Sequence, residues 1–227
     1  MAPISVADYI RDLDRKEVHP RGQGPFITIS RQYGCYGFSV ASRLAELLNE
    51  GRHHGPAVWK AYGTETLSEL AEQTHVPLKV LERQRRSEPT YINELFRLLY
   101  HESTPSCWEI RRRITTIIRG LALGGHAIIV GHGGSCATAD LAHGLSVRTE
   151  APQDWRIRQV AMYQRIGLAH AARLIRQGEA ERQFLRGIYA IRFPRSPAFN
   201  IVYDCSVFSV EEIARHVASL MHIRQLA

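Results

Sequence analysis

Short runs of apolar and β-branched residues alternate with longer stretches of helical period along the 227-residue chain. The runs Phe26–Ile29 and Ala127–Val130 are uninterrupted, which is typical of strands buried on both faces. Weaker strand candidates are Ala57–Trp59, Leu145–Thr149 and Ile201–Tyr203. Because buried strands that alternate with helices pair in parallel through right-handed crossovers, the pattern predicts a layered α/β fold.

Helical periodicity fills most of the sequence between these strands. Apolar spacing predicts helices over about 40–48, over about 110–123 before the Gly124-Gly125 pair, and over about 210–221. A helical period also runs from Thr64 to about Tyr100, and Arg-rich helices are expected from Gln153 to about Arg192. We expect residues 1–24 to form an N-terminal helix, over 4–16, with a connection, and residues 25–227 to form a single domain.

Glycine-rich turns follow the two strongest strands. Gly34–Gly37 comes after the first of them and Gly131–Gly134 after the second. Ligands of parallel sheets lie at the carboxyl ends of the strands. Glycines there let backbone N–H groups turn toward an anion, which the N-terminus of the next helix also attracts. The sequence therefore predicts a phosphate site, and a ligand-free strand-to-helix turn is the structural alternative.

The charge of the chain is compatible with an anionic ligand. The formal net charge is +7, and lysine occurs only at Lys16, Lys60 and Lys79, so arginine supplies most of the positive charge. Arginine binds phosphate bidentately, which favours phosphate ligands, although a nucleic-acid binder would also fit. The four cysteines form no C-x-x-C pair, which indicates buried thiols in a reducing compartment. With no signal peptide and no membrane-length apolar run, we expect a cytoplasmic protein without a membrane partner.

Several segments resemble one family in the same order along the chain. Residues 26–37, FITISRQYGCYG, resemble the opening I-T-I-S-R-x-(F/Y)-G-S-G-G of the cytidylate kinase-like family, which is related to the nucleoside monophosphate kinases. Residues 125–133, GHAIIVGHG, are similar to G-x-x-V-I-V-G-R-G. Residues 199–206, FNIVYDCS, are similar to Y-D-L-V-I-N-T-S. With a further match at 147–152, the resemblance spans about Phe26 to Met221.

The resemblance implies a three-layer P-loop NTPase-type parallel sheet with helices on both faces. It also implies an ATP-binding nucleoside monophosphate kinase-like protein that uses Mg²⁺ and transfers phosphate to a cytidylate-type acceptor. An acceptor-binding helical region would cover about 63–123 and an arginine-rich lid about 173–195. The ATP phosphates would lie over Gly34, Cys35, Tyr36, Gly37, Phe38 and Ser39, with the Ser39 hydroxyl able to reach the Mg²⁺ ion.

Charged side chains would complete this site. Phosphoryl transfer depends mainly on positioning and on positive charge around the phosphates. Arg31, directly before the loop, and the lid residues Arg182 and Arg186, spaced i, i+4, are therefore the candidate catalytic residues. The candidate substrate-binding residues are His132, Arg173 and Arg176.

The chain departs from the family pattern at the residues closest to the phosphates. Gly37 stands where monophosphate kinases carry the loop lysine, and we expect its backbone to need a positive φ. Tyr36 and Phe38 are bulky, His132 replaces the arginine of G-R-G, and no acidic residue follows Val130. These departures predict weak activity. They also leave two alternatives open: a non-catalytic nucleotide-binding regulator and, less favoured, a nucleic-acid-binding protein. The oligomeric state is not indicated.

Overall fold

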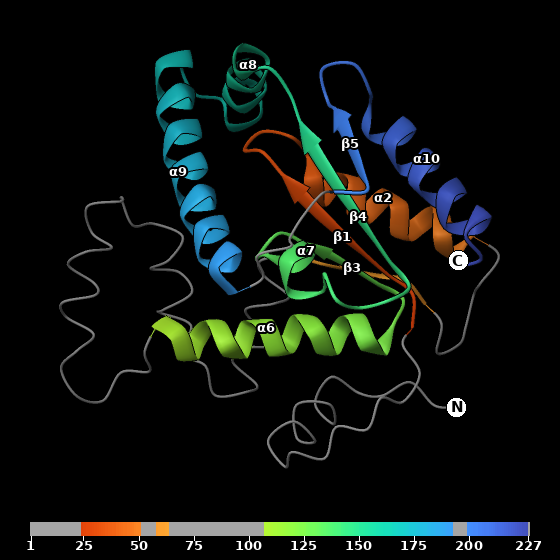
Figure 1. The fold of residues 1–227 in the computed structure, drawn as a ribbon. Coiled ribbons are helices and arrows are strands. Elements are labelled where there is room, and N and C mark those ends of the chain that lie inside the picture. Colours follow the sequence, from red (N-terminus) through yellow and green to blue (C-terminus); the bar gives the residue numbers. More distant parts are fainter. Residues whose placement is uncertain (1–23, 51–57, 64–106, 193–198, 227) are drawn as a thin grey trace.

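The computed structural model describes residues 24–50, 58–63, 107–192 and 199–226, with only the backbone described at 107–113, 181 and 184–192. The helices expected over 4–16 and from Thr64 to about Tyr100 lie outside these ranges, as does most of the expected acceptor-binding region. The described ranges contain all five strands of one sheet and the helices that cover it (Figure 1).

The sheet is entirely parallel. Its strands are β1 (Phe26–Arg31), β2 (Lys60–Tyr62), β3 (Ala127–Val130), β4 (Gly144–Glu150) and β5 (Ile201–Asp204). They lie in the order β2-β3-β1-β4-β5. The first strand is therefore central, and the chain builds the sheet first on one side of it and then on the other. The carboxyl ends of β1, β3 and β4 meet at this switch point, where parallel sheets bind their ligands.

Helices cover both faces of the sheet. Helices α2 (Gly37–Asn49) and α10 (Val210–Ile223) lie against one face, and α6 (Cys107–Gly124) and the short α7 (Gly134–Ala137) against the other (Figure 1). Helices α8 (Gln153–Gln164) and α9 (Leu168–Arg192) stand beyond the carboxyl ends of the strands. The three-layer α/β architecture predicted from the sequence is thus confirmed.

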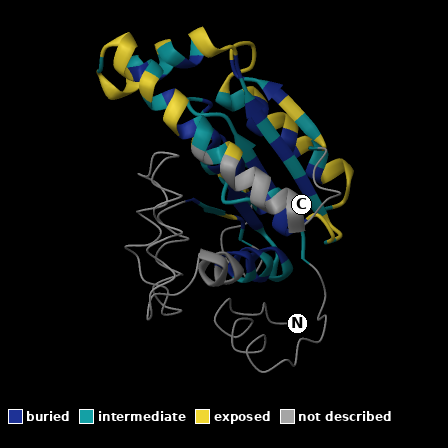
Figure 2. Cartoon of the chain, turned by 60° about the vertical axis from the view of Figure 1, so that its left-hand side comes forward, coloured by how far each residue is buried: buried dark blue, intermediate teal, exposed yellow. Residues whose placement is uncertain are grey.

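The apolar runs of the strands divide between two cores. Ile27 and Ile29 point into the core shared with α2 and α10, whereas Phe26 points into the core shared with α6. In β3 the same alternation sends Ile128 to the first core and Ile129 to the second. The buried residues accordingly follow the middle of the sheet, and the outer faces of the helices are exposed (Figure 2). Burial on both faces explains why these strands lack polar alternation.

The strand expected at Ala57–Trp59 is wrong in position, because the strand is Lys60–Tyr62. The reason is the side chain of Asn49, which accepts a hydrogen bond from the Trp59 N–H at 2.8 Å and donates one to the Trp59 carbonyl at 2.9 Å. These contacts take both backbone groups of Trp59 out of the ladder. Trp59 instead fills the core, with 1% of its surface exposed, as expected for a packing tryptophan.

Candidate functional site

Arg31 ends β1 and lies between the two glycine-rich turns. Its aliphatic stem passes Gly37, where an added Cβ would stand 3.1 Å from the Cβ, Cγ and Cδ of Arg31. Its guanidinium covers Gly131, where an added Cβ would overlap Nη1 and lie 2.6 Å from Cζ. Glycine at both positions leaves room for the observed path of this one arginine side chain.

The guanidinium of Arg31 is poorly compensated. Within the described part of the chain, the side chain of Arg31 makes no hydrogen bond and no ion pair. Burial, and then the positive charge of Arg182, lower the pKa of Arg31 to about 10. A buried cation costs free energy unless it is paired. The positive charge of Arg31 has no carboxylate partner among the described residues and lies at the carboxyl end of a parallel sheet. This is a suitable place for an anion to bind.

The loop between β1 and α2 uses left-handed backbone at two residues. Gly34 has a φ of 91° and Tyr36, the N-cap of α2, a φ of 36°. The expectation of a positive φ at Gly37 is wrong, because Gly37 is already the first residue of the helix and is absent from the residues with positive φ. The bend is made one residue earlier, at Tyr36, and what restricts residue 37 is the Arg31 stem.

Side chains from β4 and the segment after β5 hold the loop from inside. The Thr149 hydroxyl donates to the carbonyl oxygen of Cys35 at 2.9 Å, and the Sγ of Cys205 lies 4.0 Å from the same oxygen. Directly after β1, the side-chain oxygen of Gln32 accepts from the Ala151 N–H at 3.0 Å. The loop is therefore fixed to the two neighbouring strands.

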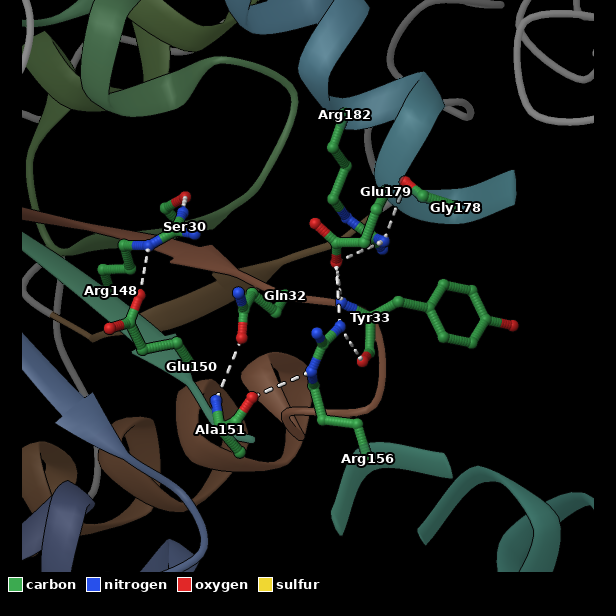
Figure 3. Close-up of polar contacts among 10 residues, drawn as sticks. All are labelled: Ser30, Gln32, Tyr33, Arg148, Glu150, Ala151, Arg156, Gly178, Glu179 and Arg182. Atoms are coloured by element: carbon green, nitrogen blue, oxygen red, sulfur yellow. Dashed lines mark hydrogen bonds and ion pairs between the residues drawn. The ribbon is translucent and has the colours of Figure 1, made fainter. Parts of the chain in front are cut away.

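Helices α8 and α9 fasten the outer side of the loop through an ion pair (Figure 3). The buried Arg156 donates through Nε to the Ala151 carbonyl at 3.0 Å, and its Nη1 lies 3.4 Å from Glu179 Oε1. The same carboxylate oxygen accepts from the Tyr33 N–H at 2.6 Å. A carboxylate of the expected lid thus occupies a backbone donor of the loop. Sequence reasoning missed Arg156, Thr149 and Glu179 as loop contacts.

Arg182, predicted as a catalytic residue, lies on α9 next to the loop. Its guanidinium lies over the Tyr33 ring, 5.2 Å from the centroid, and donates to the Gly178 carbonyl at 3.1 Å (Figure 3). Its Nη1 is 3.9 Å from Glu179 Oε1. Since its charge also acts on Arg31, the structure brings the predicted residues Arg31 and Arg182 together.

A second arginine–carboxylate pair lies at the end of β4. Arg148 donates through Nε to Glu150 at 3.0 Å, and its Nη1 is 3.3 Å from the Ser30 hydroxyl (Figure 3). The Phe199 ring lies under its guanidinium, with Cζ 5.3 Å from the centroid. Arg148 therefore has a carboxylate partner, which Arg31 lacks among the described residues.

The bulky loop residues Tyr36 and Phe38 pack in opposite directions. Tyr36 contacts the α8 rings of Trp155 and Tyr163, with centroids 5.7 Å and 5.3 Å away, and its hydroxyl donates to Gln159. Burial raises the pKa of Tyr36 to about 12. Phe38 lies against Gly63 at the end of β2 and remains half exposed. Neither ring fills the space beside Gly131.

The second glycine turn carries His132, the predicted acceptor-binding residue. Gly131, His132 and Gly133 all have positive φ, at 79°, 53° and 72°. This backbone places the turn directly after β3 and beside the Arg31 guanidinium. The predicted convergence of the two glycine-rich turns is therefore seen in the structure.

The remaining predicted residues are more dispersed. Arg173 and Arg176 are exposed on α9, and the described contacts do not join them to the loop. Arg186 lies in the same helix, where the structure describes only the backbone. Ser39 is exposed in the first turn of α2.

The described residues do not form a self-sufficient metal site. They contain no group of three or more histidine, cysteine, aspartate or glutamate side chains that could hold a metal ion. Asp140 is paired with Arg119, and Asp204 accepts from Ser206. The Ser39 hydroxyl fits Mg²⁺ as a single ligand only, so the other ligands would have to come from a bound phosphate and water.

A sequence profile of the cytidylate kinase-like family matches residues 26–206. The chain belongs to this family. It is a nucleotide kinase-like protein, and both the loop at 34–39 and the turn at 131–134 lie inside the matched segment. No curated protein matches the chain significantly.

Solved structures resemble the fold. An uncharacterized protein from Eubacterium ventriosum superposes with a TM-score of 0.61 at 17% identity, over 87% of this chain and 98% of that one. A shikimate kinase from Bacteroides thetaiotaomicron has a TM-score of 0.48 at 13% identity, over 87% of this chain and 98% of that one. Among the described residues, no helix is long and apolar enough to span a membrane.

Proposed function

We propose that this protein binds a nucleoside triphosphate, with ATP as the first candidate, at Gly34–Ser39. The observation that carries the proposal is the Arg31 guanidinium, half-buried between two glycine turns with no acidic partner among the described residues. A phosphate group would supply the missing negative charge. It would also accept hydrogen bonds from loop N–H groups at the start of α2.

In this proposal Arg31 takes the part of the loop lysine. The Cβ of a lysine at position 37 would stand only 3.1 Å from the Arg31 stem and would crowd it. One cation therefore occupies this space, supplied from the end of β1 rather than from the first turn of α2. Arg182 adds a second charge from α9, and the family membership favours phosphoryl transfer as the purpose of these charges.

We further propose that the acceptor is a cytidylate-type monophosphate and that transfer is slow. His132 stands where the family pattern has an arginine. The two N–H groups of a histidine ring point in different directions, so histidine cannot bind one phosphate with two parallel hydrogen bonds as arginine does. Loose positioning of an acceptor can cost several kcal/mol of barrier. A Mg²⁺ ion, if used, would arrive with the triphosphate and neutralise phosphate charge beside Ser39.

One observation favours a second candidate, a nucleotide-binding regulator without catalysis. Glu179 holds the Tyr33 N–H at 2.6 Å, so a loop donor that could meet phosphate is engaged by the lid. Triphosphate binding would then compete with this carboxylate and release α9 from the loop. Such a protein would change conformation on binding and would not need to transfer phosphate.

Binding and turnover measurements separate the candidates. Calorimetry with nucleoside mono-, di- and triphosphates, with and without Mg²⁺, tests the binding proposal, and a coupled ADP-release assay with CMP, dCMP, UMP and AMP tests transfer. ATP binding with slow CMP turnover supports the kinase, and ATP binding without turnover supports the regulator. Salt-sensitive binding of nucleic acid with no preference among nucleotides would support the nucleic-acid alternative instead.

A further inference from the structure

Cys35 and Cys205, 170 residues apart, meet beneath the loop. Both thiols are reduced and buried, with 1% and 7% of the residue surface exposed. The Sγ of Cys205 lies 4.0 Å from the Cys35 carbonyl oxygen, and both residues belong to the same buried core. Cys35 belongs to the turn before α2, and Cys205 is the first residue after β5.

The same two positions carry hydroxyl residues in the family pattern that the chain resembles. Cys35 stands at the serine of G-S-G-G and Cys205 at the threonine of N-T-S. Two changes of the same kind therefore face each other in the folded chain, where a disulfide becomes chemically available. The third described cysteine, Cys136, is also buried but lies in α7, on the opposite face of the sheet.

We propose that Cys35 and Cys205 are a redox modification site that closes to a disulfide under peroxide. A disulfide needs an S–S bond of about 2.05 Å and close Cβ atoms, and the 4.0 Å contact between the Cys205 Sγ and the Cys35 carbonyl oxygen brings the two buried cysteines next to each other. Cys205 borders the exposed turn at Ser206–Ser209, and local opening of this turn would admit the small oxidant.

The chemistry assigns different parts to the two sulfurs. The interaction between the two side chains lowers the pKa of Cys205 and raises that of Cys35. The Cys205 thiolate attacks one peroxide oxygen, the O–O bond breaks, and the hydroxide that leaves is protonated to water. The Cys35 sulfur then attacks the resulting sulfenic sulfur as its proton is lost. The S–S bond forms, the S–O bond breaks, and a second water leaves with that proton.

The disulfide would alter the loop that we propose to bind phosphate, so this consequence rests on the proposed function. Cys35 lies between the left-handed residues Gly34 and Tyr36, and its carbonyl is held by Thr149. Drawing its Cβ toward Cys205 reorients the neighbouring N–H groups. We expect oxidation to weaken ATP binding by about tenfold, within the usual range for coupled sites.

Peptide mapping of the full chain after hydrogen peroxide treatment and alkylation of free thiols tests the site. A dithiothreitol-sensitive peptide joining Cys35 to Cys205, absent from Cys205→Thr and retained in Cys136→Ser, supports it. Cys205→Thr restores the family-like hydroxyl and so protects the fold. Free alkylated Cys35 and Cys205 after treatment, or either of them joined only to another cysteine, would overturn the proposal.

ATP calorimetry on the same samples tests the consequence. The expected result is weaker binding after oxidation that dithiothreitol restores, with no oxidation effect in Cys205→Thr. A complete cross-link that leaves ATP affinity unchanged contradicts the effect on the loop. If reduced protein binds no nucleotide, the proposed function has failed, and the peptide map still decides whether the disulfide forms.

Discussion

The guanidinium of Arg31 covers the backbone of Gly131, so closely that any Cβ at Gly131 would overlap Nη1. This contact joins the end of β1 to the turn after β3. It also explains the glycine, whose φ of 79° would strain other residues as well. The relationship places a positive charge without an acidic partner among the described residues where the two glycine-rich turns meet.

If Arg31 takes the place of a loop lysine, then Arg31 and a lysine at position 37 are alternative sources of the same positive charge. Gly37→Lys alone should crowd the Arg31 stem and reduce ATP affinity. Arg31→Ala should also reduce it, whereas the double variant should recover at least part of the loss, because the lysine then has room. Calorimetry of the four proteins measures the coupling as a double-mutant cycle. Strictly additive losses would contradict the exchange of roles.

The lowered pKa of Arg31 predicts that folding stability and ATP affinity change in opposite directions as the pH rises. The unfolded arginine titrates above about pH 12, so the unfolded state holds the proton more tightly. Arg31 therefore destabilises the fold at neutral pH, and this cost is relieved as the pH rises through its pKa of about 10.

Phosphate binding requires the charged form of Arg31 and follows the opposite trend. The titration of Arg31 should leave ATP affinity unchanged below about pH 9 and should lower it by up to about tenfold per pH unit above the folded pKa of Arg31. Arg31→Lys should move this fall to lower pH, since lysine has the lower intrinsic pKa. An Arg31→Ala protein with the same alkaline fall would show that another group causes it.

Glu179→Gln should separate stability from binding. The amide still accepts from the Tyr33 N–H, but the ion pair with buried Arg156 is lost, which should lower the free energy of unfolding by about 1–2 kcal/mol. Removing a negative charge near the proposed phosphates should instead raise ATP affinity, by about fivefold. Denaturant unfolding and calorimetry measure the two effects.

The matched control for Glu179→Gln is Glu211→Gln. Glu211 also pairs with arginine, through Arg43 and Arg215, but it lies on α10 and outside the loop contacts. Its substitution should leave ATP affinity unchanged. Weaker ATP binding in Glu179→Gln would mean that the carboxylate supports the nucleotide-binding form of the loop.

His132→Arg should strengthen acceptor binding if His132 lies in the acceptor site. An arginine fork on a monophosphate contributes about 1–3 kcal/mol, so the KM for CMP should fall by about tenfold or more in the coupled assay. His143→Arg is a suitable control, because His143 also has a positive φ, of 62°, but precedes β4 at its amino end. Brisk wild-type turnover that His132→Arg reduces would contradict the weak-kinase proposal.

Much of the fold could be predicted because local pattern and tertiary environment agree. Phe26–Ile29 and Ala127–Val130 are apolar at every alternation except Thr28, and both are buried on two faces. The prediction for β2 was displaced by three residues because β2 is an edge strand that pairs with β3 and begins with the exposed Lys60. A strand that is buried so little does not need a run of apolar residues, so the sequence shows none there. The apolar residues that suggested a strand at 57–59 include Trp59, which is buried in the core directly before β2 begins.

The site was predictable only in part. Glycine spacing located both turns, the position directly before the loop pointed to Arg31, and the resemblance to the family's lid region pointed to Arg182. The contact between Glu179 and the Tyr33 N–H joins residues 146 positions apart and depends on where α9 lies across the loop. The meeting of Cys35 with Cys205 depends likewise on the strand order, which no local pattern encodes.

The most direct test of the central claim is calorimetric titration of ATP into the wild-type and Arg31→Ala proteins, with Arg215→Ala as a control from the exposed surface of α10. We predict that Arg31→Ala keeps its fold by circular dichroism and loses about 1–3 kcal/mol of ATP binding free energy, about tenfold to a hundredfold in Kd. Inorganic tripolyphosphate should show the same loss, and Arg215→Ala should bind as wild type. Undiminished binding of ATP by correctly folded Arg31→Ala would contradict the account.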